Sequence, residues 1–164
     1  MSYPPVRYTG DAGLALATFR PASVPPDLDN PSGGGAAYLA PGSLTGGDYG
    51  LFRWDMPATP SGPAPHFHRT MSEAFFVLSG AVRLFDGERT VEAGAGDFLY
   101  VPPGGIHAFR NESGEPASML ILFAPGAPRE SYFEELAEMA REGRQLDQQE
   151  RDELYARHDQ YMVR

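Results

Sequence analysis

The chain has 164 residues, enough for one hydrophobic core of ordinary size and too few for two comfortable domains. Its formal net charge of -9, with no cluster of Lys and Arg, excludes a nucleic-acid-binding surface and favours a small-molecule partner. The chain has no cysteine, which excludes disulfides, thiolate metal sites and cysteine nucleophiles. Any metal must therefore be held by nitrogen and oxygen atoms.

The sequence predicts no membrane partner and a cytoplasmic location. The first ten residues contain no apolar run of the kind that a secretory signal needs. The apolar run from Met119 to Phe123 is far too short to cross a bilayer.

Residues 1–127 are predicted to form one all-β domain. Residues 1–65 are dense in Gly, Pro, Ser and Asp, with short apolar runs between them, which is typical of loop-rich β-structure. Further short apolar runs, bounded by turn residues, follow at 73–80, 81–94, 97–105, 106–111 and 117–126. The Asp86-Gly87 pair predicts a tight hairpin. This spacing favours an antiparallel sandwich or barrel.

Residues 128–164 are predicted to form a helical C-terminal tail. A first helix is expected to start with a capping box of Ser131 and Glu134 and to stop at Gly143. A second is expected to start at Asp147, with Glu150 as its capping partner. The predicted inward-facing residues are Phe133, Leu136, Ala137, Ala140, Leu154, Tyr155, His158, Tyr161 and Met162. We expect this tail to pack on the barrel or on a partner chain.

Two of the four histidines, His66 and His68, stand one residue apart, and Glu73 follows them. Side chains alternate between the faces of a strand, so both imidazoles project from the same side and converge. If Glu73 opens the next strand, it shares a face with Phe75 and can turn toward the pair. His107 follows a Pro-Gly turn, where a strand re-enters a sheet. Because imidazole is the commonest metal ligand, this grouping predicts a metal site.

The residues of this grouping resemble the two motifs of the cupin family. The first motif, G-x5-H-x-H-x3,4-E-x6-G, is matched by Gly62, His66, His68, Glu73 and Gly80, although Gly62 stands two residues too close to His66. The second, G-x5-P-x-G-x2-H-x3-N, is matched at every spacing by Gly96, Pro102, Gly104, His107 and Asn111. The resemblance covers about residues 46–125. It implies an antiparallel jelly-roll barrel with one divalent metal bound by the residues His66, His68, Glu73 and His107.

A site of three imidazoles and one carboxylate leaves coordination positions open for a substrate or dioxygen. Fe, Ni, Mn, Cu and Zn all accept these ligands, so the sequence does not select one metal. The candidate substrate-binding side chains are Phe52, Trp54, Phe75, Tyr100 and Phe109. Arg53 or Arg83 would anchor an anionic substrate if either faced inward.

The chain is also similar to bacterial quercetinase-like dioxygenases. This similarity implies a metal-dependent dioxygenase of a planar, enolisable aromatic such as a flavonol, with Glu73 as ligand and catalytic base. The alternatives are a metal-assisted isomerase or cyclase of a natural-product pathway, and a non-catalytic small-molecule-binding cupin. We further expect a homodimer, because the Gly- and Pro-rich N-terminal third has little core of its own. His158 is assigned a structural role.

Overall fold

The computed structural model describes residues 2–29 and 34–163. The strands are β1 (Leu28–Asp29), β2 (Gly35–Ala40), β3 (Gly50–Met56), β4 (His66–Phe67), β5 (Ser72–Ser79), β6 (Val82–Phe85), β7 (Thr90–Ala93), β8 (Phe98–Val101), β9 (Ala108–Arg110), β10 (Ala117–Ala124) and β11 (Tyr161–Met162). The helices are α1 (Gly42–Thr45), α2 (Arg129–Glu142) and α3 (Gln148–Arg157). Within the described ranges, every helix is too short or too polar to cross a bilayer.

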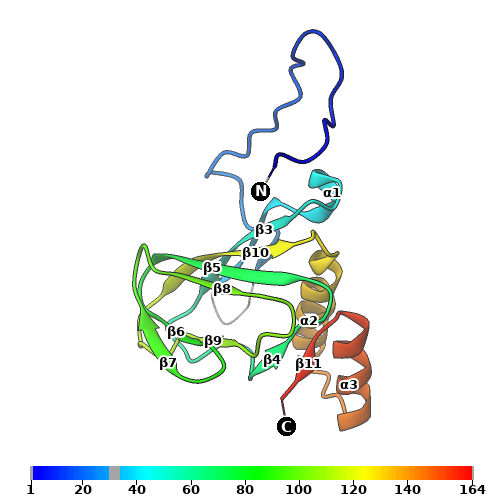
Figure 1. Ribbon diagram of the computed structural model, residues 1–164. Coiled ribbons are helices and arrows are strands. Elements are labelled where there is room, and N and C mark those ends of the chain that lie inside the picture. The colour runs from blue at the N-terminus through cyan, green and yellow to red at the C-terminus, as the bar shows by residue number, and fades with distance from the viewer. Residues whose placement is uncertain (1, 30–33, 164) are drawn as a thin grey trace.

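The strands form two layers that face one another (Figure 1). The larger sheet has the order β1-β2-β3-β10-β5-β8, and each neighbouring pair is antiparallel. The second layer contains the sheet β7-β6-β9 and the pair β11-β4. An isolated bridge between His66 and His107 connects these two parts. The all-β fold with C-terminal helices agrees with the prediction.

Alternation along the strands places the core between the layers. In β10, Met119, Ile121 and Phe123 are buried, whereas the residues between them are only half-buried. In β5, Glu73 and Phe75 are buried on the inner face, as the sequence predicts. Burying one large apolar side chain contributes about 1.5–3 kcal/mol, so this inner face supplies much of the stability of the barrel.

The two C-terminal helices differ in how well the sequence predicts their starts. The first helix, α2, begins at Arg129, and Pro128 takes the N-cap position without a side-chain cap. The predicted capping box at Ser131 is therefore wrong, because this residue lies within the first turn and its hydroxyl donates back to the Pro128 carbonyl. The predicted stop at Gly143 and the predicted capping box of α3, formed by Asp147 and Glu150, are confirmed.

The chain after α3 does not continue as a helix. Asp159 adopts a left-handed backbone conformation with φ 53°, and β11 follows it. Its carboxylate accepts hydrogen bonds from the backbone N–H groups of Arg69 and Thr70 and from the Thr70 hydroxyl. The prediction that Tyr161 and Met162 lie on a helix is thus wrong, because these bonds end the helix and bring β11 beside β4.

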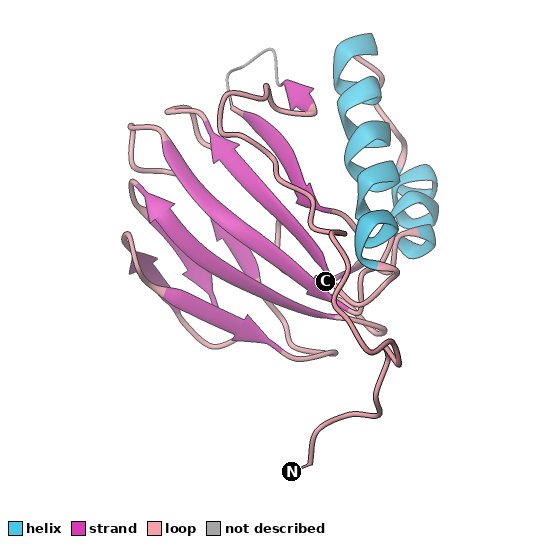
Figure 2. Ribbon diagram, turned by 90° about the horizontal axis from the view of Figure 1, so that it is seen from above, coloured by secondary structure: helices cyan, strands magenta, loops and turns pink. Residues whose placement is uncertain are grey.

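Helices α2 and α3 lie together on one side of the barrel (Figure 2). The ring of Phe133 meets Phe52 edge-on with 5.3 Å between centroids and lies 5.0 Å from the Trp54 ring. Leu154 of α3 is buried as well. The tail therefore shares one core with the strands and closes one side of the barrel interior.

Candidate metal centre

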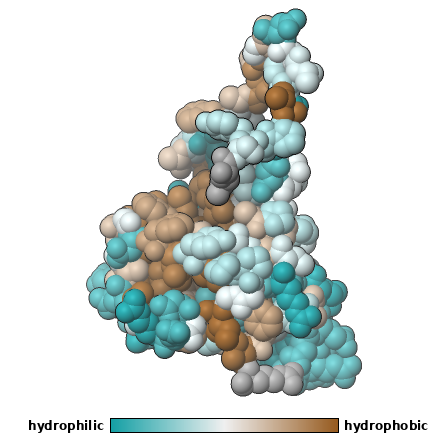
Figure 3. Space-filling model, viewed as in Figure 1, coloured by the Kyte–Doolittle hydropathy of each residue, from teal (hydrophilic) through white to brown (hydrophobic). Residues whose placement is uncertain are grey.

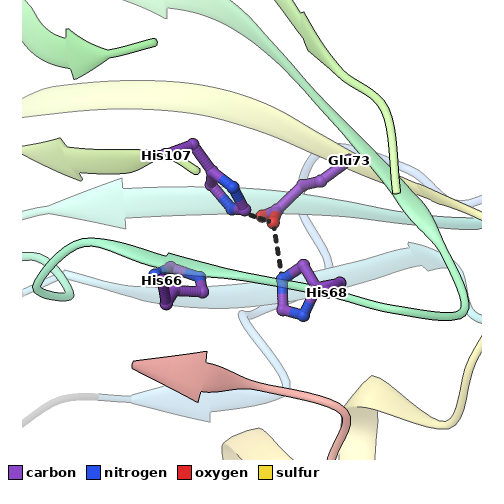
Figure 4. A group of neighbouring side chains, drawn as sticks. All are labelled: His66, His68, Glu73 and His107. Carbon is purple, nitrogen blue, oxygen red and sulfur yellow. Dashed lines mark hydrogen bonds and ion pairs between the residues drawn. The ribbon is translucent and has the colours of Figure 1, made fainter. Parts of the chain in front are cut away.

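Four buried side chains converge inside the barrel, as Figure 4 shows. His66 belongs to β4 and His68 follows it directly, while Glu73 lies in β5 and His107 immediately precedes β9. One ligand atom from each residue lies within 4.8 Å of all the others. The residues that the sequence groups together are thus brought to one point from both layers.

Each imidazole is oriented by a backbone carbonyl. The Nδ1 atom lies 2.8 Å from the Ala64 carbonyl in His66 and 3.0 Å from the Gly105 carbonyl in His107. In His68 it lies 2.5 Å from the Asp159 carbonyl. A carbonyl only accepts, so each Nδ1 must carry the proton. In the neutral form of such a ring, the Nε2 lone pair is free to bind a cation.

The donor atoms fit a divalent metal. The Glu73 Oε2 atom lies 2.7 Å from His107 Nε2 and 3.0 Å from His68 Nε2 (Figure 4). A carboxylate oxygen and an imidazole lone pair both accept, so contacts this short require a proton or a cation between them. One divalent ion would satisfy all of these acceptors, and three nitrogens with one oxygen suit Fe, Ni, Mn, Cu or Zn.

Burial and mutual contacts shift the pKa values of three of the four clustered residues. Burial lowers the pKa of His66 to about 4, so this ring is neutral and available as a ligand. Burial acts in the opposite direction on Glu73, but hydrogen bonds from His107 and His68 hold the pKa of its carboxyl far below the usual range. Glu73 is therefore an ionised carboxylate at neutral pH. The same carboxylate raises the pKa of His107 against the effect of burial.

A cavity of about 490 Å³ adjoins the cluster and is lined by His66 and Glu73. It lies between the barrel interior and the helical tail. Its apolar walls include Trp54, Phe109, Ile121, Phe123, Phe133 and Leu136. This size and lining are typical of small-molecule sites.

Comparison with known proteins agrees with this geometry. Residues 52–123 match the family model of the Cupin domain. The crystal structure of a predicted oxalate decarboxylase from Thermotoga maritima superposes with a TM-score of 0.57, at 21% identity, and covers 66% of this chain and 99% of that chain. The chain has a cupin fold. At this level of identity, the superposition speaks for the fold alone.

Two curated proteins match shorter stretches of this chain. Quercetin 2,3-dioxygenase of Bacillus subtilis is 30% identical over 61 residues, which are 37% of this chain and 18% of that protein. An uncharacterised protein of Aquifex aeolicus is 36% identical over 62 residues, which are 37% of this chain and 50% of that protein. The matches thus cover half or less of the length of these curated relatives.

The aromatic residues that the sequence suggests as substrate contacts have different positions in the cupin barrel. Trp54 and Phe109 line the cavity. Phe52 and Phe75 are fully buried in the core and are not among the described residues that line it. Tyr100 is 57% exposed, because it pairs with Ala74 on the outer face of the larger sheet. The suggestion that Tyr100 contacts the substrate in this cavity is therefore corrected.

The structure places the two arginines whose direction the sequence left open. Arg53 pairs with Asp55 at 3.0 Å, and Arg83 pairs with Glu112 at 2.7 Å. Neither is among the described residues that line the cavity, whereas Arg129 of α2 is. Arg129 stands in the first turn of α2, where a cation opposes the helix macrodipole. Its position there is the one sequence feature which indicates that a tertiary contact stabilises it.

The contact from Asp159 to His68 yields a testable prediction. Replacing Asp159 with alanine removes the carboxylate that holds residues 69 and 70 and shifts the carbonyl that orients His68. Loss of a group that orients a metal ligand typically lowers metal affinity about 10- to 100-fold, and we expect a loss of this size. Competition with a chelator measures it.

Asp159→Asn is the matched control, because asparagine tolerates the left-handed conformation and keeps one acceptor oxygen. It should retain most of the affinity. An Asp159→Ala protein with wild-type affinity would show that the tail does not orient His68.

Proposed function

We propose that this cupin is a metal-dependent dioxygenase acting on a planar, enolisable aromatic such as a flavonol. The observation that carries the proposal is a buried cluster of three imidazoles and one carboxylate at an apolar cavity with aromatic walls. The partial match to a quercetin 2,3-dioxygenase supports the same reaction class.

His66, His68, Glu73 and His107 would hold the metal. A bound divalent ion supplies Lewis-acid polarisation of a substrate oxygen and an open position for a further ligand. Such a reaction incorporates both atoms of dioxygen into the products with the substrate as electron donor, so it needs no reductant from outside.

The side chains around the cavity would exclude water, accept a proton and hold the substrate. The apolar walls exclude water and hold a flat ring system, which protects a reactive enolate from side reactions. Glu73 reaches the cavity, so its carboxylate would lie within reach of the hydroxyl proton of the substrate. Trp54 and Phe109 provide aromatic surface for stacking.

The test begins with elemental analysis of the purified protein and reconstitution with Fe, Ni, Mn, Cu or Zn. An oxygen electrode then records uptake with flavonols and other enolisable aromatics. We expect uptake with at least one metal and a product that contains both oxygen atoms. If no polyphenol, enol or enediol supports uptake, the dioxygenase proposal fails. Product formation without oxygen would then indicate an isomerase or cyclase. Ligand binding without product formation would indicate a non-catalytic cupin.

We also propose that a second copy of the chain covers the outer face of the larger sheet. This outer face carries the exposed side chains of Phe76, Leu78, Phe98 and Tyr100. Figure 3 shows apolar side chains gathered over this part of the molecule. Monomers seldom expose apolar surface of this kind. With a net charge of -9, two copies repel each other least where they meet through uncharged faces.

Substitution of Phe98 by aspartate should convert the dimer into a monomer, because it places a charge on an apolar face that is 63% exposed in the single chain. Light scattering at micromolar concentration measures the mass. Val91→Asp, on β7 of the other sheet, is the control and should leave the dimer intact. A wild-type monomer at this concentration would refute the proposal.

A further inference from the structure

Arg129 is a buried cation at the wall of the cavity. Its side chain is only 4% exposed, although it lines the same space as His66 and Glu73. The guanidinium lies over aromatic rings, 4.3 Å from the centroid of Tyr132 and 5.0 Å from that of Phe123. These rings fix the plane of the guanidinium and stabilise its charge.

The hydrogen bonds of Arg129 leave one of its three guanidinium nitrogens without a partner. The Nη1 atom donates to the His158 carbonyl at 2.7 Å, and Nη2 donates to Gln160 Oε1 at 3.3 Å. The Nε atom is buried and has no hydrogen-bond partner in the described part of the chain. Among the described residues, no carboxylate forms a hydrogen bond with the Arg129 guanidinium. Buried charges are normally paired, and a buried donor without a hydrogen bond is unfavourable.

The charge of Arg129 interacts with the charge of Glu73 in the metal cluster. Burial lowers the pKa of its guanidinium, and the charge of Glu73 acts against this effect. The charge of Glu73, however, is already engaged by His68 and His107. Among the described residues that line the cavity, Arg129 is the only Arg or Lys. The cavity wall therefore carries one guanidinium group, whose positive charge acts on whatever occupies the cavity.

A second polar atom in the cavity wall is also unsatisfied. The Oγ atom of Ser61 is buried without a hydrogen-bond partner, and Ser61 lines the same cavity. Two unpaired polar groups in residues that line one cavity favour a ligand that brings its own acceptors.

We propose that the guanidinium of Arg129 binds an ionised oxygen of the substrate at the cavity wall. The substrate class is then a planar, largely apolar molecule with two oxygen functions, one directed to the metal cluster and one anionic. This inference rests on the proposed function only in that the substrate occupies this cavity. A carboxylate and an acidic phenol both supply the required oxyanion.

A purely structural role for Arg129 makes a different prediction. The bonds to His158 and Gln160 tie α2 to the chain that leads into β11. If this were the whole role, loss of Arg129 would weaken charged and neutral ligands equally. The charge dependence of ligand affinity therefore separates binding from scaffolding.

The experiment uses isothermal titration of the zinc-loaded protein, which does not depend on oxygen chemistry. One ligand pair is 3,4-dihydroxybenzoate and its amide, and the other is 3,7-dihydroxyflavone and 3-hydroxyflavone. The first pair tests a carboxylate and the second an acidic phenol. A charge-assisted hydrogen bond contributes about 1.5–3 kcal/mol, so we expect the ionised member of at least one pair to bind about 10- to 100-fold more tightly.

In Arg129→Met this preference should disappear, and in Arg129→Lys part of it should remain. Arg83→Met, which removes an arginine outside the cavity lining, should keep it. Zinc content and thermal unfolding are recorded for every variant, and the titrations are repeated without metal. Equal affinity within both pairs, failure of the ionised members to bind, or an unchanged preference in Arg129→Met would overturn the proposal. Because none of these readouts involves turnover, absence of oxygenase activity leaves the test intact.

Discussion

Replacing His66 with alanine will strip most of the bound metal while leaving a folded β-protein. The substitution removes one of four converging ligands, and the remaining three residues keep their carbonyl and carboxylate partners. His66 lines the cavity, so its replacement by alanine enlarges an existing space. Because the imidazole is neutral, its loss does not leave a charge unpaired in the core. Elemental analysis measures the metal content, and far-ultraviolet circular dichroism verifies the fold.

His158→Ala is the matched control, because His158 lies outside the cluster and bonds to Glu135 at 3.0 Å. It should retain a full complement of metal. A double variant, His66→Ala with His107→Ala, removes ligands from two strands that meet at an isolated bridge. Full metal occupancy in this double variant would disprove the assignment of the site.

Replacing Glu73 with glutamine should lower turnover by about 10²- to 10⁴-fold if the carboxylate acts as the base, since this is the usual contribution of a positioned base. Glutamine keeps an oxygen that can face the metal but cannot take a proton at neutral pH. Turnover per bound metal is compared at equal occupancy, and substrate affinity is measured separately.

The contrasting outcome follows from the contacts of Glu73 with His68 and His107. If Glu73 serves only as a ligand, turnover per bound metal in Glu73→Gln will stay near that of the wild type. Unchanged turnover would thus remove the base role while leaving the metal site in place. A large fall with the substrate still bound would support the base.

The fold and the four clustered residues follow from local rules together with the resemblance to the two cupin motifs. Alternation on short strands predicts which side chains share a face, and the burial of Glu73 and Phe75 agrees with it. Even Gly62, whose spacing departs from the cupin motif, lies where glycine is required. It has φ 135°, and a Cβ there would approach the Phe109 carbonyl oxygen to 2.0 Å.

The features that the sequence does not predict depend on contacts between distant segments. The apolar spacing around Tyr161 fits a helix, but the hydrogen bonds of Asp159 to residues 69 and 70 favour a strand. Tyr100 looks like a cavity residue until its register with Ala74 places it outside. Arg129 becomes a candidate binding residue only when α2 is placed against the barrel. Tertiary packing decides each of these cases, so local patterns cannot.

The hydrogen bond between His68 and the Asp159 carbonyl spans 91 residues, and this separation fixes an order of assembly during synthesis. All four clustered residues leave the ribosome before Asp159 does, so the nascent barrel exists for a time with the His68 ring unanchored. The contacts that orient the three imidazoles are therefore complete only when the tail has docked on the barrel.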